Sequence, residues 1–206
     1  MPNGLPTEHA ALTEPLAVGV HAVEKAALKG DEAPLVVGCG PVGLAVIAAL
    51  RLKNIRPIVA ADFSPKRREL AEKMGADIVV DPAKGNLYSH LAGDKKAAIF
   101  ECVGVPGIIQ QILEGAPRDA RVVVVGVCME PDTIEPMFGI VKELSLQFVL
   151  GYTPEEFARS LRLLAEGQVD APSLITGKVG LDGVKGAFSE LANPERHTKI
   201  LVEPWR

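Results

Sequence analysis

The chain has 206 residues, of which 48% are hydrophobic and 23% are charged, and its formal net charge is −4. This length suits one large domain or a domain with an appendage, because domains usually have roughly 100–200 residues. The composition excludes a disordered or low-complexity chain. The excess of acidic over basic residues, with no basic block, argues against nucleic acid or an anionic membrane surface as the main partner.

Cysteine usage and the N-terminus indicate a reducing, cytoplasmic setting. Cys39, Cys102 and Cys128 are too widely spaced for a disulfide framework or a zinc ribbon, and the first 12 residues lack the pattern of a signal peptide. Residues 33–50 carry no charge, but glycines and prolines interrupt the centre of this run. A membrane span broken there would leave backbone groups unpaired in lipid, so we expect a buried strand, a turn and a buried helix instead.

The middle of the chain alternates short apolar runs with helical patterns. The apolar runs predict strands at residues 35–37, 58–61, 77–81, 97–101 and 121–127. Helical patterns begin near residues 42, 65 and 108, with Ser64 placed to cap the second helix and Gly75 to end it. Unbroken apolar strands indicate burial on both faces, which is typical of a parallel sheet covered by helices. The sequence therefore predicts a doubly wound α/β domain.

The pattern changes after residue 140. Residues 144–151 could form one more strand, at an edge of the sheet. Thr153 and Glu156 fit a capping box, with Pro154 as the first residue of the helix that follows. Shorter elements are expected at residues 175–179, 184–191 and 199–202. This C-terminal part is too small for a core of its own, so we expect it to pack against another part of the protein.

The glycine motif Gly38-Cys39-Gly40-Pro41-Val42-Gly43 lies between a predicted strand and a predicted helix, and Asp62 follows 19 residues later at the end of the next strand. This arrangement is typical of dinucleotide-binding sites. Gly38 permits the tight turn, Gly40 lets the backbone approach a pyrophosphate at the helix N-terminus, and Gly43 permits close packing of the helix on the strand. Asp62 would accept hydrogen bonds from the adenosine ribose. The alternative is a glycine turn needed only for packing, with Asp62 as a helix cap.

Asp62 also favours NAD over NADP, because a carboxylate there repels a 2′-phosphate. Arg67, between Lys66 and Arg68, could offset that repulsion in part; the alternative is a solvated helix face. Methyltransferases that use S-adenosylmethionine share a glycine turn, but they usually carry an acidic residue where this chain has Val36.

Several stretches elsewhere in the chain form a set with the glycine motif. They are Thr-Glu-Pro-Leu-Ala-Val-Gly at residues 13–19, Lys-Met-Gly-Ala-Asp at 73–77, Phe-Glu-Cys-Val-Gly at 100–104, Val-Val-Gly at 124–126 and Lys-Ile-Leu-Val at 199–202. Together they resemble the medium-chain, zinc-dependent alcohol dehydrogenases, above all the polyol (sorbitol-type) and threonine dehydrogenase branches.

This resemblance implies a six-stranded Rossmann sheet that binds NAD(H). Residues 17–151 would form the dinucleotide-binding domain, residues 1–16 would be an entry segment from the catalytic domain, and residues 152–206 would return to that domain. Val103, Val125 and Leu150 would match strand ends that border the nicotinamide. The segment 144–151 would match a strand that commonly pairs across a homodimer.

The family's catalytic zinc does not match residues of this chain. By resemblance, Cys and His-Glu residues of an N-terminal catalytic domain hold the zinc, and this chain has no Gly-His-Glu run. Its four histidines lie at no ligand spacing to one another or to a cysteine. Glu14 occupies a position near the metal in polyol-type relatives, but with Pro15 after it we expect a first-turn helix acid. We therefore assign no metal ligand and no catalytic residue.

The leading hypothesis is the NAD(H)-binding portion of a zinc-type alcohol or polyol dehydrogenase that lacks its catalytic domain and is not catalytically competent alone. A second hypothesis is a regulatory module that changes its self-association when cofactor binds. A third is a zinc-independent reductase of the quinone type.

Overall fold

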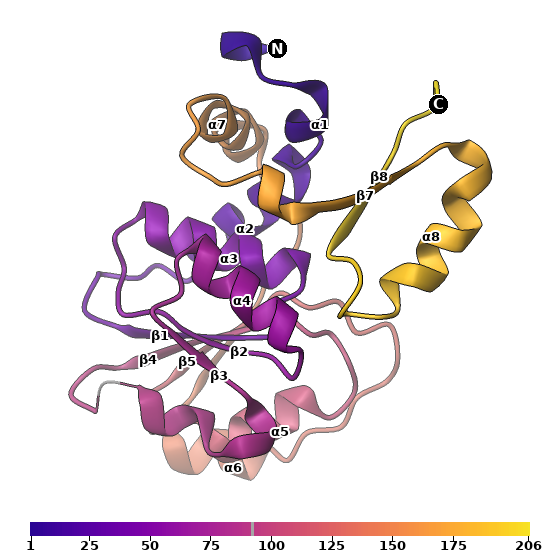
Figure 1. Cartoon of the computed structure of the whole chain (residues 1–206). Helices are drawn as coiled ribbons and strands as arrows, with labels where there is room; N and C mark the ends of the chain where they lie inside the picture. The colour runs from indigo at the N-terminus through magenta and orange to yellow at the C-terminus, as the bar shows by residue number, and fades with distance from the viewer. Residues whose placement is uncertain (92) are drawn as a thin grey trace.

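The computed structural model describes residues 1–91 and 93–206, and its centre is a parallel sheet of six strands in the order β3-β2-β1-β4-β5-β6 (Figure 1). The strands are β1 (Ala33–Val37), β2 (Val59–Ala61), β3 (Ile78–Val80), β4 (Ala97–Glu101), β5 (Arg121–Val124) and β6 (Ser145–Phe148). The strand order reverses between β1 and β4, as it does in doubly wound folds. The predicted fold class is therefore confirmed.

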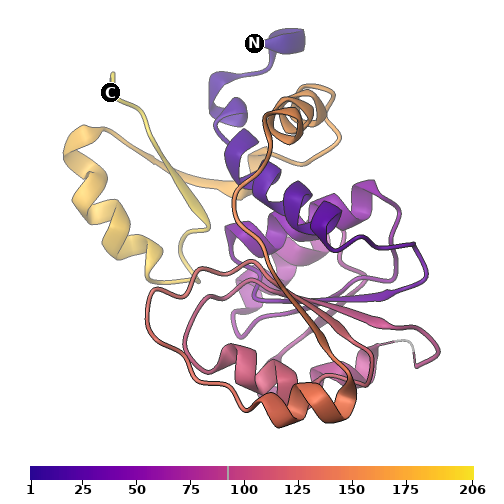
Figure 2. The ribbon, with the colours of Figure 1, turned by 180° about the vertical axis from the view of Figure 1, so that it is seen from behind.

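Helices cover both faces of the sheet. One face carries α2 (Thr13–Lys25), α3 (Pro41–Leu52) and α4 (Pro65–Met74), and the other carries α5 (Ile108–Gly115) and α6 (Pro136–Lys142) (Figures 1 and 2). A short helix, α1 (Thr7–Ala10), precedes α2. Among the described residues, no helix is long and apolar enough to cross a membrane. The uncharged run at residues 33–50 is divided between β1, the turn after it and most of α3.

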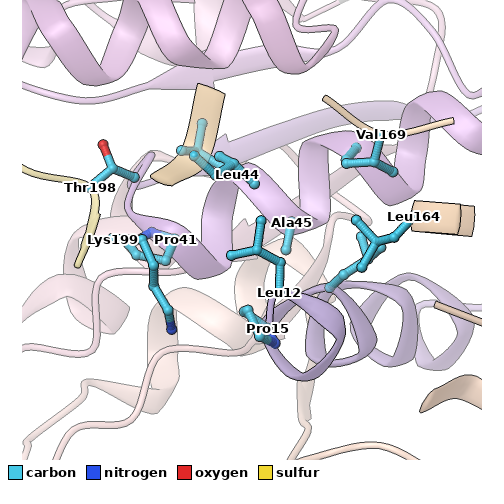
Figure 3. Close-up of a pocket in the computed structure, with 12 residues that line it drawn as sticks. Leu12, Pro15, Pro41, Leu44, Ala45, Leu164, Val169, Thr198 and Lys199 are labelled. Atoms are coloured by element: carbon cyan, nitrogen blue, oxygen red, sulfur yellow. The ribbon is translucent and has the colours of Figure 1, made fainter. Parts of the chain in front are cut away.

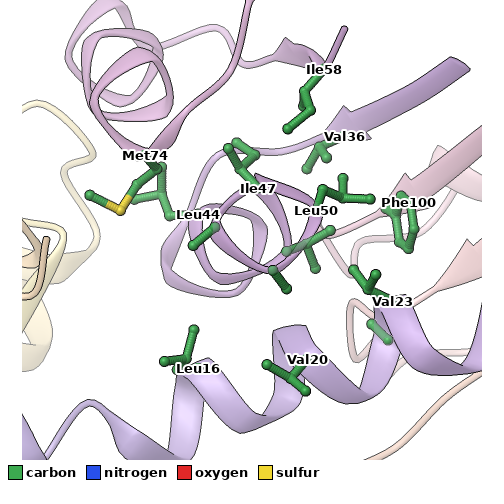
Figure 4. Close-up of a cluster of buried hydrophobic side chains, with 14 of the residues drawn as sticks. Leu16, Val20, Val23, Val36, Leu44, Ile47, Leu50, Ile58, Met74 and Phe100 are labelled. Carbon is green, nitrogen blue, oxygen red and sulfur yellow. The ribbon is translucent and has the colours of Figure 1, made fainter. Parts of the chain in front are cut away.

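The hydrophobic core lies in two layers, one on each face of the sheet. Every residue of β1 and β4 is buried, because helices cover both sides of these central strands. In the layer between the sheet and α2, α3 and α4, Phe100 of β4 and Val36 of β1 belong to one buried cluster with Ile47 of α3 and Val20 of α2 (Figure 4). The opposite layer forms between the other faces of the same strands and α5. The sheet is thus fixed on both sides, and its strand ends have a rigid support.

The C-terminal part of the chain returns over α2. Helix α7 (Pro154–Ala165) packs on α2, and its N-terminus has the predicted capping box: Thr153 Oγ1 accepts from Glu156 N–H at 3.2 Å, and Glu156 Oε2 accepts from Thr153 N–H at 2.7 Å. Beyond it, β7 (Ile175–Val179) and β8 (Lys199–Val202) form a separate parallel pair, joined by α8 (Val184–Leu191). These last three elements have the predicted bounds.

Besides shifts of one to three residues at the ends of other strands and the unpredicted helix α1, two differences from the sequence-based expectation stand out. Strand β5 ends at Val124 rather than at residue 127, because the N–H groups of Val125 and Gly126 both turn back to the carbonyl oxygen of Glu101 at 2.9 Å. Helix α6 was not predicted; it is short and begins at Pro136 without a side-chain cap. Strand β6 is an edge strand, which agrees with the expectation for residues 144–151.

Candidate functional site

The largest described cleft opens at the carboxyl ends of β1, β2 and β4, beside the point where the strand order reverses. It encloses about 980 Å³, near the upper end of the roughly 300–1,000 Å³ typical of small-molecule sites. Its walls come from the glycine turn after β1, the turn between β2 and α4, the loop after β3, the loop after β4, helix α5, and Pro194 with Glu195. In open α/β sheets, ligands bind at this switch point.

The three glycines of the turn differ in why their positions lack a side chain. Gly38 has φ +91°, a conformation that side chains disfavour. A Cβ on Gly43 would lie 1.9 Å from the carbonyl oxygen of Gly38, so helix α3 approaches the turn as closely as it does only because residue 43 has no side chain. A Cβ on Gly40 would meet nothing within 4 Å. Gly38 and Gly43 are thus required by the fold itself, whereas Gly40 faces open space.

The N-terminus of α3 points its backbone donors toward this open space. Gly40 is the N-cap residue, Pro41 is the first helical residue, and the first backbone bond of the helix runs from Leu44 N–H to Gly40 O at 2.9 Å. Val42 and Gly43 precede that bond, so their N–H groups have no acceptor within the helix. Such an N-terminus favours an anion through its free N–H groups and its dipole.

Asp62 connects the glycine turn to the turn before α4. Its Oδ2 accepts from Cys39 N–H at 2.8 Å, and its Oδ1 accepts from Ser64 N–H at 2.8 Å. The residue is 9% exposed and lines the cleft. Ser64 itself caps α4 by accepting from Arg67 N–H at 3.1 Å. Asp62 therefore organises two turns and also presents a carboxylate at the cleft wall.

The three basic residues of α4 have different surroundings. Arg67 lines the cleft, with Nη1 3.7 Å from Asp62 Oδ2, and its buried Nε has no hydrogen-bond partner among the described residues. Arg68 donates to the carbonyl oxygens of Asp62 and Phe63. Lys66 donates to the carbonyl oxygens of residues 195 and 196, which ties the C-terminal segment to α4. Only Arg67 is placed to meet a ligand in the cleft.

The structure brings most of the predicted cofactor-binding residues together. The predicted residues that line the cleft are Gly38, Gly40, Pro41, Asp62, Arg67 and Val103. Val42 and Gly43 follow them in the first turn of α3. The two remaining residues lie apart: Val125 is 6% exposed and packs in the core, and Leu150 is 84% exposed beyond the end of β6. Neither side chain lines this cleft, and their assignment to the nicotinamide stays a prediction.

Sequence reasoning missed other residues of the cleft. Tyr88 lines it from the loop after β3. Its ring packs so closely on Gly115 that a Cβ on that glycine would lie 2.1 Å from Cε2 of the ring. Burial raises the pKa of Tyr88 to about 12, so the phenol stays protonated. Pro194 and Glu195 reach the cleft from near the end of the chain. No local pattern marks these residues, since only the tertiary fold brings them here.

Cysteines and acidic residues provide no metal centre in the described part of the chain, where no group of three or more His, Cys, Asp or Glu is placed to hold a metal ion. The described residues therefore do not fit the catalytic zinc ion that the resembled dehydrogenases hold. Glu14 lies in the first turn of α2, as predicted. Burial, followed by the charge of Asp62, raises the pKa of the Cys39 thiol to about 12, which makes it unreactive at neutral pH.

A second, smaller hollow lies where α2, α3 and the C-terminal part meet (Figure 3). Leu12, Leu44 and Leu164 are among its mostly apolar lining, and its volume of about 20 Å³ could hold little more than one water molecule. It is a small packing cavity between α2, α3 and the C-terminal part rather than a ligand site.

Residues 41–166 match the family model described as zinc-binding dehydrogenase. The chain belongs to this family. It is 34% identical over 209 residues to (R,R)-butanediol dehydrogenase of Bacillus subtilis (strain 168), an alignment that covers 99% of this chain and 60% of that protein. The crystal structure of 2R,3R-butanediol dehydrogenase from Bacillus subtilis matches with a TM-score of 0.85, again over 99% of this chain and 60% of the other. This zinc-binding dehydrogenase chain thus spans about 60% of the length of these relatives.

Two further solved structures contain a nicotinamide dinucleotide. A zinc-binding dehydrogenase from Sinorhizobium meliloti 1021 bound to NADP is 28% identical, with a TM-score of 0.82 over 95% of this chain and 59% of that one. An alcohol dehydrogenase from E. coli CFT073 complexed with NADH has a TM-score of 0.85 over 97% of this chain and 60% of that one; at 23% identity it shows the shared fold alone.

Proposed function

We propose that this chain is the NAD(H)-binding part of a zinc-type alcohol or polyol dehydrogenase. The observation that carries the proposal is the open space at Gly40, where the N-terminus of α3 faces a cleft that has Asp62 on its wall. A pyrophosphate at this N-terminus would receive the N–H groups of Val42 and Gly43. The adenosine ribose would then lie toward Asp62.

NAD is the preferred cofactor in this proposal, and NADP is the weaker one. The Asp62 carboxylate lies at the cleft wall and would accept from ribose hydroxyls, while its charge opposes a 2′-phosphate. Arg67 would offset that repulsion in part, because its Nη1 lies 3.7 Å from Asp62 Oδ2 and its Nε–H meets no acceptor among the described residues. The balance of one buried carboxylate and one partly exposed guanidinium favours NAD.

The nicotinamide end of the cofactor would lie at the loops that follow β4, β5 and β6. Val103 is 43% exposed and offers an apolar side chain to it. Since the side chain of Val125 is buried, this residue would act through its backbone, and Leu150 would approach from beyond β6. A bound nicotinamide would supply hydride chemistry, and the residues of this chain would hold it and exclude water from one side.

The substrate and the zinc would be held by a catalytic domain outside these 206 residues. This part of the proposal is supported by the 60% coverage of the relatives and by apolar side chains exposed beside β8 and α8. They include Trp205 at 97%, Phe188 at 74% and Leu181 at 62% exposure. Covering such a face with another domain would remove this apolar surface from water.

A homodimer through β6 completes the proposal. In the described sheet β6 pairs with β5 on one side, and its other edge is open to a further strand. Phe148 on the strand is 63% exposed, and Ile140 and Met137 of the adjacent α6 are 73% and 70% exposed. Pairing of two copies along this edge would extend the sheet and bury these side chains.

Isothermal titration with NAD and NADP tests the cofactor assignment. The wild-type chain should bind NAD more tightly than NADP, and absence of heat with either at millimolar concentration would refute the proposal. Asp62→Asn is a poor variant, because both oxygens of Asp62 accept N–H groups and an amide would oppose one of them. Asp62→Ala should weaken NAD by about tenfold and NADP by less, since a hydrogen bond to a charged group contributes about 1.5–3 kcal/mol. Equal losses would mean that Asp62 only supports the turns.

A further inference from the structure

Glu101, the last residue of β4, is a carboxylate in a nearly dry place. The residue is 1% exposed, at the end of a strand whose other residues are all apolar. Its hydrogen-bond partners are backbone N–H groups rather than a cation. Burial of a charge without a cation is expensive, so a fold that keeps one needs a reason for it.

The carboxylate holds the loop that follows β4. Oε1 accepts from Val103 N–H at 2.6 Å and from Gly104 N–H at 2.8 Å. Val103 lines the cleft, and Gly104, at φ +71°, lies against the backbone of Val127. These two bonds fix the backbone at Val103 and Gly104, and thereby the position of the Val103 side chain at the proposed nicotinamide subsite.

The same residue also reaches the loop that follows β5. Its backbone oxygen accepts from Val125 N–H and Gly126 N–H, both at 2.9 Å. A Cβ on Gly126 would lie 2.7 Å from Glu101 Oε2, so only glycine fits beside the carboxylate. Glu101 thus lies between the two strand ends at which the proposed function puts the nicotinamide.

We infer that Glu101 is a positioning residue for the nicotinamide half of the cofactor, and that its buried charge favours the oxidised cofactor over the reduced one. The inference rests on the proposed function. The nicotinamide ring carries a positive charge in NAD⁺ and none in NADH, so a nearby negative charge attracts only the oxidised ring. In protein surroundings with an effective dielectric constant of about 20, the attraction between two unit charges stays above the thermal energy at a separation of about 10 Å. The bound couple would therefore have a lower reduction potential than it would with a neutral residue at position 101.

Separate titrations of the full chain with NAD⁺ and NADH test this inference, with the ratio of the two dissociation constants as the readout. In Glu101→Gln, the carbonyl oxygen can replace Oε1 and accept both N–H groups, while the charge is removed. NAD⁺ should then weaken about tenfold more than NADH, the size expected for one unit charge at about 10 Å. An unchanged ratio would overturn the inference, because loss of a purely structural contact weakens both forms alike.

Glu101→Asp is the complementary variant, since it keeps the charge and withdraws the carboxylate from Val103 and Gly104. Both affinities should fall, and their ratio should stay within about twofold. A changed ratio in this variant would overturn the inference even if Glu101→Gln failed to fold. The matched control is Glu166→Gln, an exposed glutamate at the end of α7, which should leave both constants unchanged. A wild-type chain that binds neither form would refute the proposed function itself, and this is a different result from an altered ratio.

Discussion

Gly43→Ala and Gly40→Ala should separate the demands of the fold from those of the cofactor. At position 43, the new Cβ would lie 1.9 Å from the carbonyl oxygen of Gly38 and 2.9 Å from its carbonyl carbon. Both are backbone atoms and cannot rotate away, so α3 and the turn must separate by about 1 Å. Overpacking of this kind costs about 1–3 kcal/mol, and the better helix propensity of alanine returns at most about 1 kcal/mol. We expect a net loss of about 1–2 kcal/mol and little NAD binding.

At position 40 the outcome should be reversed. A Cβ there meets nothing within 4 Å, and φ is −70°, which any residue adopts. The free energy of unfolding should change by less than about 1 kcal/mol, because only a weak N-cap preference is lost. The methyl group would nevertheless occupy the space where the pyrophosphate approaches, and NAD affinity should fall at least about tenfold, or about 1.4 kcal/mol.

Urea unfolding followed by circular dichroism, together with calorimetric NAD titration, measures both quantities for each variant. Gly186→Ala in α8 is the matched control, because its Cβ also meets nothing within 4 Å. It should stabilise the chain slightly and leave NAD affinity unchanged. A Gly40→Ala variant that binds NAD like the wild type would refute the assignment of the pyrophosphate to this turn. A Gly43→Ala variant as stable as the wild type would refute the packing argument.

Three further predictions concern stability and assembly. Thr153→Ala removes half of the capping box of α7 and should lower the free energy of unfolding by about 0.5–2 kcal/mol; urea unfolding with no loss would contradict this. Burial, with the Asp62 charge, raises the pKa of Cys39 to about 12, above about 8.5 for an unfolded thiol. The contribution of this thiol to the free energy of unfolding should therefore be full below about pH 8.5 and fall as pH rises toward 12. The fall should be less steep in Cys39→Ala than in Cys128→Ala, and equal slopes would exclude this cause. Phe148→Lys should convert a dimer into a monomer in sedimentation velocity, whereas a wild-type chain that sediments as a monomer would contradict pairing through β6.

Elements with a local signal could be predicted from the sequence. Ser64 caps α4 and Gly75 ends it in the left-handed conformation, because both roles depend on residues within one turn. The apolar strands were recognisable because burial on both faces removes the usual alternation. The glycine turn could be recognised because its spacing, between an apolar strand and an apolar helix, is itself a local pattern.

Contacts between distant segments could not be predicted in the same way. The bond from Cys39 N–H to Asp62 needs the pairing of β1 with β2, and the packing of Tyr88 on Gly115 needs the assembled sheet. Glu101 had a weak signal, a charge at the end of an apolar strand, but its acceptor role needs the loop geometry. Of the positions transferred by resemblance, Val103 lines the cleft, whereas the assignment of Val125 and Leu150 to the nicotinamide stays a prediction.

A crystal structure of this chain grown with NADH tests the central claim most directly. The account predicts density for the dinucleotide in the described cleft, with the pyrophosphate beside Gly40 and the ribose within hydrogen-bond distance of Asp62. Density for the cofactor elsewhere on the chain, or an empty cleft in crystals saturated with NADH, would contradict it.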